Sequence, residues 1–251
     1  MPSEIGAALR FPATLACMSY RIVGGRLMRD AAGSTVSPGK GSIPVICDAG
    51  FDGQPFDPGP LGGDAAAELS AKAASGLVAD FARPDSPALR EAAGELARAA
   101  ARAGVPLYTS PAYEPYAPGA HVMVGSNIVR GSLKTALTEA AQRWGKDRVA
   151  LEIVPQRTDF TLPAGDSAGQ RLSEAELADR IRELAPMSFF SSELCAKYFT
   201  YLSRDRQAHF VLYDDASTVL AKLRTAESCG VDTAFLLYSE VAAMLPEICA
   251  E

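Results

Sequence analysis

Three carboxylates are placed where a folded chain could use them as acids or bases. Asp48 and Asp80 each follow a run of small and apolar residues typical of a buried strand, and Glu152 lies inside a third run, between Leu151 and Ile153. The carboxyl end of a strand is where a barrel of parallel strands and helices holds its reactive groups. Two neighbouring carboxylates raise one pKa and can then supply an acid and a base. We therefore take Asp80, Asp48 and Glu152 as candidate catalytic residues, with a structural aspartate that bonds loop amides as the alternative for Asp80.

Aromatic and amide side chains at other predicted strand ends are candidates for contacting a ligand. Tyr238 ends the last predicted strand, and Glu240 follows two residues later and would share its face. Tyr108 ends another strand and leads into an aromatic and acidic loop at 113–116, and Asn127 lies near the end of a further one. A tyrosine ring can stack on a sugar while its hydroxyl donates or accepts a hydrogen bond. The alternative is that the tyrosines fill the core and the loop packs as a cover.

Two pairs of charges are also predicted. A buried Glu152 needs a partner, which Arg148 or Arg157 could provide. Glu193 and Lys197 are four residues apart and would pair on an exposed helix face.

The elements that must position these residues alternate between strands and helices. Ser86 followed by Pro87, and Ser173 followed by Glu176, are typical helix starts. Strands are predicted over 15–23, 42–48, 75–81, 105–108, 121–128 and 148–155, and helices over 64–74, 86–102, 131–145 and 217–228, with another that starts at 173. This alternation predicts an α/β fold with a parallel sheet, a TIM-type barrel formed by residues 1–251 as a single domain. Its N-terminal quarter should be irregular or abbreviated, because 31–41 is rich in Gly, Ser and Pro and has no helix signal.

The segment 75–84 resembles the strand-four signature of family 18 glycoside hydrolases (chitinases and relatives), D-G-x-D-x-D-x-E-x-P. The matching positions are Gly76, Asp80 and Pro84, and Phe81 stands in for the usual aromatic residue. The resemblance implies that Asp80 orients the substrate's N-acetyl group, whose carbonyl oxygen attacks the anomeric carbon. It also implies that Ala82 occupies the position of the glutamate that protonates the leaving oxygen, while Ser75 and Val78 replace two aspartates. An alanine cannot transfer a proton, so the resemblance supports the fold and argues against the family's usual reaction.

A second block, 209–240, resembles the C-terminal part of the same family. There an extended Y-D-D precedes a Ser, a Lys, a helix, a Gly and a last strand that ends in Trp; the corresponding residues are Tyr213, Asp214, Asp215, Ser217, Lys222, Gly230 and, at the Trp position, Tyr238. The strand at 121–128 corresponds to one that carries M-x-Y-[DN], with Ser126 in place of the Tyr and Asn127 at the last position. The resemblance covers roughly residues 43–241 and implies a sugar-binding rim floored by Tyr238.

Composition excludes several classes of function. The net charge of −6 offers no basic surface for nucleic acid, and no stretch approaches the roughly 20 apolar residues of a membrane span. The first ten residues lack the basic cluster and apolar core of a secretory signal. Five cysteines without a C-x-x-C pair indicate free thiols in a reducing cytoplasm, and Cys195 has no neighbouring histidine that would make it a nucleophile. The two histidines, without acidic or cysteine partners at ligand spacing, predict no metal site, and we expect no cofactor.

Three functions are compatible with these patterns. The first is a carbohydrate-binding, non-hydrolytic relative of the hydrolase fold, with a small molecule or an oligosaccharide as its ligand. The second is a glycosidase that uses relocated carboxylates, Asp80 with Asp48, Glu152 or Glu240, which requires a separation of about 5 to 9.5 Å. The third is an interaction protein that keeps the barrel as a scaffold. The oligomeric state is left open by the sequence.

Overall fold

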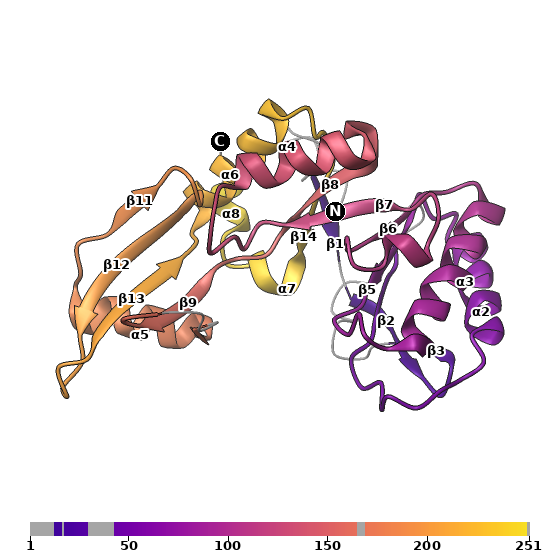
Figure 1. Ribbon diagram of the computed structural model, residues 1–251, viewed down its shortest axis with the longest axis horizontal. Helices are drawn as coiled ribbons and strands as arrows, with labels where there is room; N and C mark the ends of the chain where they lie inside the picture. The colour runs from indigo at the N-terminus through magenta and orange to yellow at the C-terminus, as the bar shows by residue number, and fades with distance from the viewer. Residues whose placement is uncertain (1–12, 17, 30–42, 165–168, 250–251) are drawn as a thin grey trace.

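The computed structural model describes residues 13–16, 18–29, 43–164 and 169–249, and Figure 1 shows two sheets with their helices. The first sheet has nine strands in the order β1-β14-β8-β7-β6-β5-β4-β2-β3, and all of its pairs are parallel except β2 with β3. Its strands are β1 (Ala13–Ala16), β2 (Met18–Val23), β3 (Arg26–Arg29), β4 (Val45–Cys47), β5 (Leu77–Asp80), β6 (Leu107–Thr109), β7 (His121–Gly125), β8 (Val149–Ile153) and β14 (Ala234–Leu237).

The eight parallel strands curl into a half-barrel, which confirms the predicted α/β, TIM-type fold. The two ends of this parallel row come from consecutive stretches of chain, because β1 ends at Ala16 beside β14 and β2 begins at Met18 beside β4. A sheet that returns to its starting segment in this way has the topology of a barrel.

The N-terminal part of the barrel is irregular, as predicted. Strand β2 pairs directly with β4, with no further parallel strand between them. Gly24 and Gly25, both with positive φ (54° and 75°), instead turn the chain into β3, which pairs antiparallel with β2. Paired positive φ values suit a two-residue hairpin turn, which glycine adopts without strain. The predicted strand at 42–48 is shorter in the structure, and Ser42, like the loop at 31–41, lies outside the described residues.

Helices cover the outer face of this sheet. They are α2 (Gly59–Ala71), α3 (Pro87–Ala103), α4 (Leu133–Trp144), α6 (Ala216–Ser228) and the short α7 (Tyr238–Val241) and α8 (Leu245–Ile248), with two 3-10 turns, η1 (Glu114–Tyr116) and η2 (Lys146–Arg148). Ser86 caps α3 as predicted, since its side chain accepts a hydrogen bond from the Leu89 N–H. The predicted start of α2 at Asp64 is wrong: the helix begins at Gly59, and Asp64 lies inside it and pairs with Arg26.

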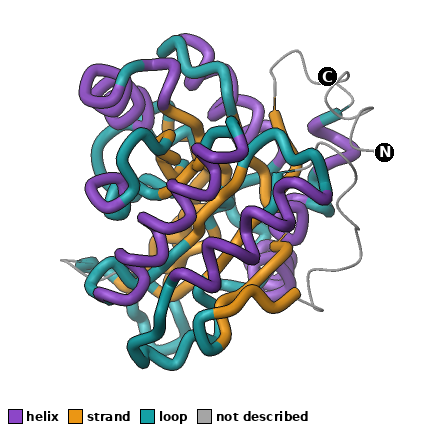
Figure 2. The backbone as a smooth tube through the Cα atoms, turned by 90° about the vertical axis from the view of Figure 1, so that its right-hand side faces the viewer, coloured by secondary structure: helices purple, strands orange, loops and turns teal. Residues whose placement is uncertain are grey.

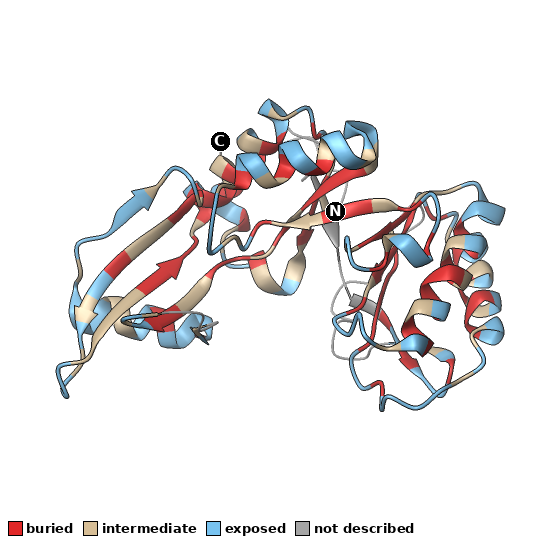
Figure 3. Ribbon diagram, viewed as in Figure 1, coloured by how far each residue is buried: buried red, intermediate tan, exposed pale blue. Residues whose placement is uncertain are grey.

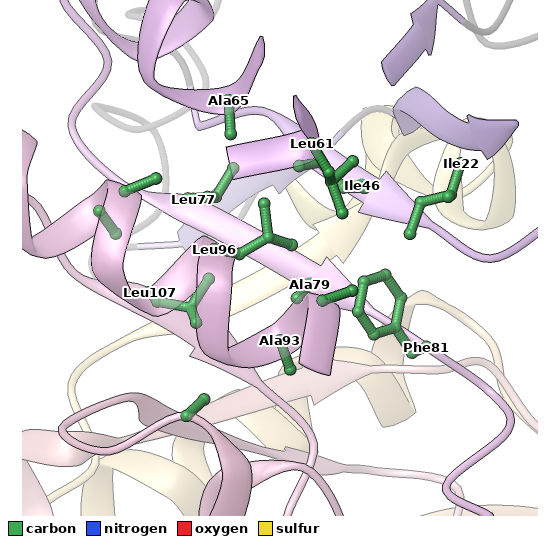
Figure 4. Packing of buried hydrophobic residues seen from close by; sticks show 14 of the residues in the cluster. Ile22, Ile46, Leu61, Ala65, Leu77, Ala79, Phe81, Ala93, Leu96 and Leu107 are labelled. Atoms are coloured by element: carbon green, nitrogen blue, oxygen red, sulfur yellow. The ribbon is translucent and has the colours of Figure 1, made fainter. Parts of the chain in front are cut away.

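Successive side chains of each strand point alternately outward, to a core under the helices, and inward, to the interior of the barrel. In β5, Leu77 and Ala79 face the helices and pack with Leu96 of α3 and Leu61 of α2, as Figure 4 shows. Val78 faces inward, where it packs with Val45, Tyr108, Met123, Ala150 and Phe235. Figure 2 shows helices crossing in front of the strands, and Figure 3 shows buried residues both on the strands of this sheet and on the helices that cover it. Asp80 has the same parity as Val78, so its carboxyl is directed into the barrel.

A second sheet, which the alternation of predicted strands and helices does not indicate, is inserted between β8 and α6. It is antiparallel, in the order β10-β9-β13-β12-β11, and one of its faces packs against α5 (Glu174–Leu184) through Leu177, Phe199 and Val211. Its strands are β9 (Arg157–Thr161), β10 (Gln170–Arg171), β11 (Phe189–Ser191), β12 (Ala196–Leu202) and β13 (Ala208–Tyr213). The predicted helical pair of Glu193 with Lys197 is wrong, because Lys197 lies in β12 and pairs with Asp215.

Candidate functional site

Asp80 is the last residue of β5, and its side chain points into the barrel. Burial raises the pKa of the Asp80 carboxyl above its ordinary value, and the nearby negative charge of Asp48 raises it further. No hydrogen bond to this carboxyl is found within the described part of the chain. Asp80 is therefore an uncompensated acid at the C-terminal end of a barrel strand, which is where such barrels hold their reactive groups.

Glu152 lies in β8 and points into the same interior. Burial raises its pKa from 4.5 to about 7, and the charge of Asp80 adds to the shift. The predicted arginine partners are wrong: Arg157 pairs with Glu240, while Arg148 pairs with Glu114 at 3.4 Å. At neutral pH the Glu152 carboxyl is therefore divided between its protonated and ionised forms, as a general acid or base requires.

A small cavity joins these two carboxyl groups. It has a volume of about 30 Å³ and is lined by Val45, Val78, Asp80, Met123, Glu152, Phe235 and Leu237. That space holds one or two water molecules, and a sugar ring does not fit in it. A glycan would have to lie above the cavity, over the C-terminal ends of the strands.

Asp48 is held in place by the loop that follows β5. Its carboxylate accepts hydrogen bonds from the Ala82 N–H (3.2 Å) and from Arg83 Nε (3.1 Å). Arg83 also donates to the backbone oxygens of Asp48 and Phe51 and lies over the Phe51 ring, so it ties the loop after β4 to the loop after β5. Asp48 therefore has its charge paired, and it acts on Asp80 through the field of its carboxylate.

Asn127 lies at the same end of the barrel as Asp80 and Glu152. A Cβ atom placed on Gly125 would lie 2.9 Å from Asn127 Oδ1 and 4.0 Å from Glu152 Oε2, so the Asn127 side chain folds over Gly125 beside Glu152. Ser126 between them is fully buried and bonds the backbone of Val154 on the β8 side. Asn127 is thus an exposed amide at the mouth of the barrel, as its predicted role in ligand binding requires.

Tyr238 and Tyr108 do not lie at the mouth of the barrel, where a side chain that stacks on a sugar would be needed. Strand β14 ends at Leu237, which lines the cavity, so Tyr238 falls on the opposite face and packs with the core under α4, α6 and α8. Tyr108 is buried inside the barrel against Phe235. Its ring also lies close to Gly76, just before β5. Burial raises the pKa of the Tyr108 hydroxyl, and the charge of Asp232, just before β14, raises it further. Both neighbours place Tyr108 toward the N-terminal ends of the strands.

Glu240 does not share a face with Tyr238, because both residues lie in helix α7, where two positions are about 200° apart. Its carboxylate Oε2 accepts from Arg157 and, at 3.0 Å, from Arg171, both of the second sheet. The predicted lip at 113–116 is also mostly structural: Tyr113 is fully buried and its hydroxyl donates to the Arg83 carbonyl.

Asp214 and Lys222, two positions of the C-terminal block that resembles the hydrolase family, have a structural role that their spacing does not predict. Their side chains form a fully buried ion pair, and Asp214 also accepts from the Gln156 N–H at 2.7 Å and from the Thr218 hydroxyl at 2.8 Å. These bonds join the end of β13 to α6 and to the chain that leaves β8. The pair therefore fixes the junction between the second sheet and the barrel.

Within the described residues, no group of three His, Cys, Asp or Glu side chains is placed to hold a metal ion. Cys195 is buried beside the Thr225 hydroxyl, 3.4 Å away, under α6. Over the same residues, no helix is both long and apolar enough to cross a membrane.

Comparison with solved structures identifies the class of fold. The chain is similar to a chitinase from Chromobacterium violaceum (TM-score 0.66, 16% identity), with 98% of this chain and 93% of the chitinase covered. It is also similar to a mutant class V chitinase from Nicotiana tobaccum that was solved in complex with NAG4 (TM-score 0.64, 12% identity, 100% and 93% covered). The fold is thus the α/β barrel of family 18 chitinases.

The same fold occurs in an enzyme of bacterial spores. The spore cortex-lytic enzyme SleL of Bacillus cereus aligns with a TM-score of 0.62 and 14% identity, over 94% of this chain and 67% of SleL. No protein-family model and no curated protein matches the sequence itself.

Proposed function

We propose that this protein binds a glycan containing N-acetylglucosamine at the C-terminal mouth of its barrel and does not hydrolyse it by the reaction of the family it resembles. The observation that carries this proposal is that an aspartate, Asp80, is present at the end of β5 while an alanine, Ala82, stands in the loop that follows. Asp80 is an acid at the mouth that accepts no hydrogen bond from the described residues, whereas Ala82, at the position that the resemblance assigns to the proton donor, has no group that can transfer a proton.

The mouth has the polar groups that hydroxyl and acetamido groups bind. Asp80 accepts hydrogen bonds, and Asn127 both donates and accepts them. Met123, Phe235 and Leu237 line the same cavity as the two carboxyls, and this burial desolvates both of them. This combination of an apolar floor and a few convergent polar groups is typical of small-ligand sites.

Calorimetric titration with N-acetylglucosamine oligomers of two to four units tests the proposal. We expect binding at millimolar concentration or tighter, weakened about tenfold in Asp80→Asn, since a hydrogen bond to a charged group contributes about 1.5–3 kcal/mol. Asp147→Asn, at an exposed position before β8, is the matched control and should bind like the wild type. An absence of binding at millimolar concentration would contradict the proposal and favour the scaffold function.

A second function has one specific observation in its favour. Glu152 has a pKa near 7 and faces Asp80 in a water-sized cavity, so it could protonate a leaving group in place of the missing glutamate. Slow release of reducing ends by the wild type that disappears in Glu152→Gln would support this relocated glycosidase. Equal background in the two proteins would contradict it.

A further inference from the structure

An arginine pair, Arg157 and Arg171, lies beside the mouth of the barrel. Arg157 opens β9, Arg171 closes β10, and the two strands pair antiparallel. Both guanidinium groups donate to the same oxygen, Glu240 Oε2. Two cations share one carboxylate here, so the cluster has a net charge of +1.

Among the described residues, this positive charge is only partly satisfied. The Arg157 side chain is 12% exposed, and its Nε is buried and has no hydrogen-bond partner among the described residues. The Arg171 side chain is 54% exposed, so the remaining N–H groups of its guanidinium face solvent. A guanidinium in this state is suited to a carboxylate, which it can bind through two parallel hydrogen bonds.

The cluster is next to the proposed glycan site. Arg157 follows the end of β8 at Ile153, and Glu240 follows the end of β14 at Leu237; these two parallel strands are neighbours in the barrel (Figure 1). Leu237 itself lines the cavity that holds Asp80 and Glu152.

The described acids at the junction of the second sheet with the barrel are themselves paired with cations. Asp214 is paired with Lys222, and Asp215 with Lys197. Among the described residues, the unbalanced charge at the junction of β8, β14 and the second sheet is therefore that of the arginine pair, whereas the negative charge of Asp80 and of ionised Glu152 lies in the cavity that Leu237 lines.

We infer that the arginine pair selects glycans that carry a carboxylate group, so that an acidic glycan binds more tightly than neutral chitin oligomers. This inference rests on the proposed function, because it adds a charge preference to the same mouth. Arg171 contacts the carboxylate of the ligand, and Arg157 holds the Glu240 carboxylate in position.

A purely structural role for the cluster makes a different prediction. If the three charges only join the second sheet to the barrel, removing any of them should lower stability and leave the preference between ligands unchanged. If Arg171 binds a carboxylate, Glu240 competes with the ligand for it. Removing Arg171 and removing Glu240 should then have opposite effects on the preference.

The experiment compares two disaccharides that differ in one group. Di-N-acetylchitobiose is neutral, and the disaccharide of N-acetylglucosamine with N-acetylmuramic acid carries an additional lactyl carboxylate; the methyl ester of that carboxylate is a third, neutral ligand. Dissociation constants are measured by calorimetry at low and high salt for the wild type, Arg171→Gln and Glu240→Gln. Arg98→Gln is the control, because Arg98 is an exposed arginine on α3 that is also paired with a glutamate, Glu95.

We expect the wild type to bind the acidic disaccharide about tenfold more tightly than the other two, which is about 1.4 kcal/mol, with a preference that weakens at high salt. Arg171→Gln should lose the preference and keep its affinity for chitobiose, Glu240→Gln should increase it, and Arg98→Gln should leave it unchanged. Equal affinity of the wild type for the three ligands would overturn the inference and leave the proposed function standing. Failure of the folded protein to bind any of them would overturn both.

Discussion

Asp80 in β5 and Glu152 in β8 line one small cavity although two strands lie between β5 and β8 in the sheet, and the charge of Asp80 helps to raise the pKa of Glu152 to about 7. Only a curled sheet brings the inward side chains of such separated strands together. The pair has the composition of an acid–base site, but its cavity has room only for water.

The first prediction concerns the pH dependence of stability. The folded-state pKa of Glu152 is raised above its unfolded value of about 4.5, so the folded state binds the proton more tightly. Glu152 therefore contributes stability below pH 4.5 that is lost as the pH rises through 7, by up to about 3 kcal/mol. In Glu152→Gln this loss should be absent. Urea unfolding from pH 4.5 to 8 measures the difference, and Glu227→Gln, on the exposed side of α6, should behave like the wild type. Parallel stability curves for wild type and Glu152→Gln would contradict the assigned pKa.

The second prediction concerns the missing proton donor. Ala82 is exposed and its N–H bonds Asp48, so a glutamate at this position should be tolerated by the fold. Ala82→Glu should hydrolyse chitotetraose at least about a hundredfold faster than the wild type, since positioned general acids contribute about 10² to 10⁴-fold. Ala82→Gln is the matched control without a transferable proton. If the rate of Ala82→Glu equals that of Ala82→Gln, Ala82 does not occupy the donor position.

The strands and helices of the barrel could largely be predicted from the sequence, because their information is local. Runs such as Leu77–Asp80 alternate between helix-facing and interior positions, and Ser86 and Ser173 cap their helices as their types suggest. The second sheet was missed because its strands pair with partners distant in sequence, as β9 does with β13. Residues in 193–197 therefore looked helical when read only against their neighbours.

The candidate site was less predictable, because it depends on where each strand ends. The sequence predicts that the last strand ends at Tyr238, with its side chain at the mouth, but β14 ends one residue earlier and Leu237 takes the inward position. The alternation along its strand predicts that Glu152 points into the barrel. It does not predict that Glu152 lacks an arginine partner, because Arg157 pairs instead with Glu240, which lies far away in the chain. The pairing of charges is a tertiary property that spacing alone does not reveal.

The third prediction concerns the close packing at the mouth. In Gly125→Ala, the added methyl group would lie 2.9 Å from Asn127 Oδ1, so the Asn127 amide must leave its present position. We expect severalfold weaker binding of chitotetraose with little change in stability, because Asn127 is exposed. In Gly63→Ala, on α2, a Cβ meets no atom within 4 Å, and the variant should bind normally and be up to about 1 kcal/mol more stable. Unchanged binding by Gly125→Ala would show that Asn127 does not contact the glycan.

The fourth prediction concerns the buried ion pair. Lys222→Met leaves the Asp214 carboxylate without its cation in a fully buried position, and breaking a buried pair from one side costs about 3–5 kcal/mol. The double variant Asp214→Asn with Lys222→Met should recover part of that loss. Lys72→Met removes an ion pair whose Glu68 partner is partly exposed and should cost less than about 1 kcal/mol. Denaturant unfolding measures all three, and a loss below 1 kcal/mol in Lys222→Met would contradict this account of the junction.

The central claim is that the mouth of the barrel binds an N-acetylglucosamine glycan and leaves it intact. Its most direct test is a calorimetric titration of the wild type with chitotetraose, followed by mass spectrometry of the same sample after prolonged incubation. We predict saturable binding at millimolar concentration or tighter and recovery of the tetrasaccharide alone. The claim is contradicted by a flat titration, or by release of shorter oligomers that stops in Asp80→Asn.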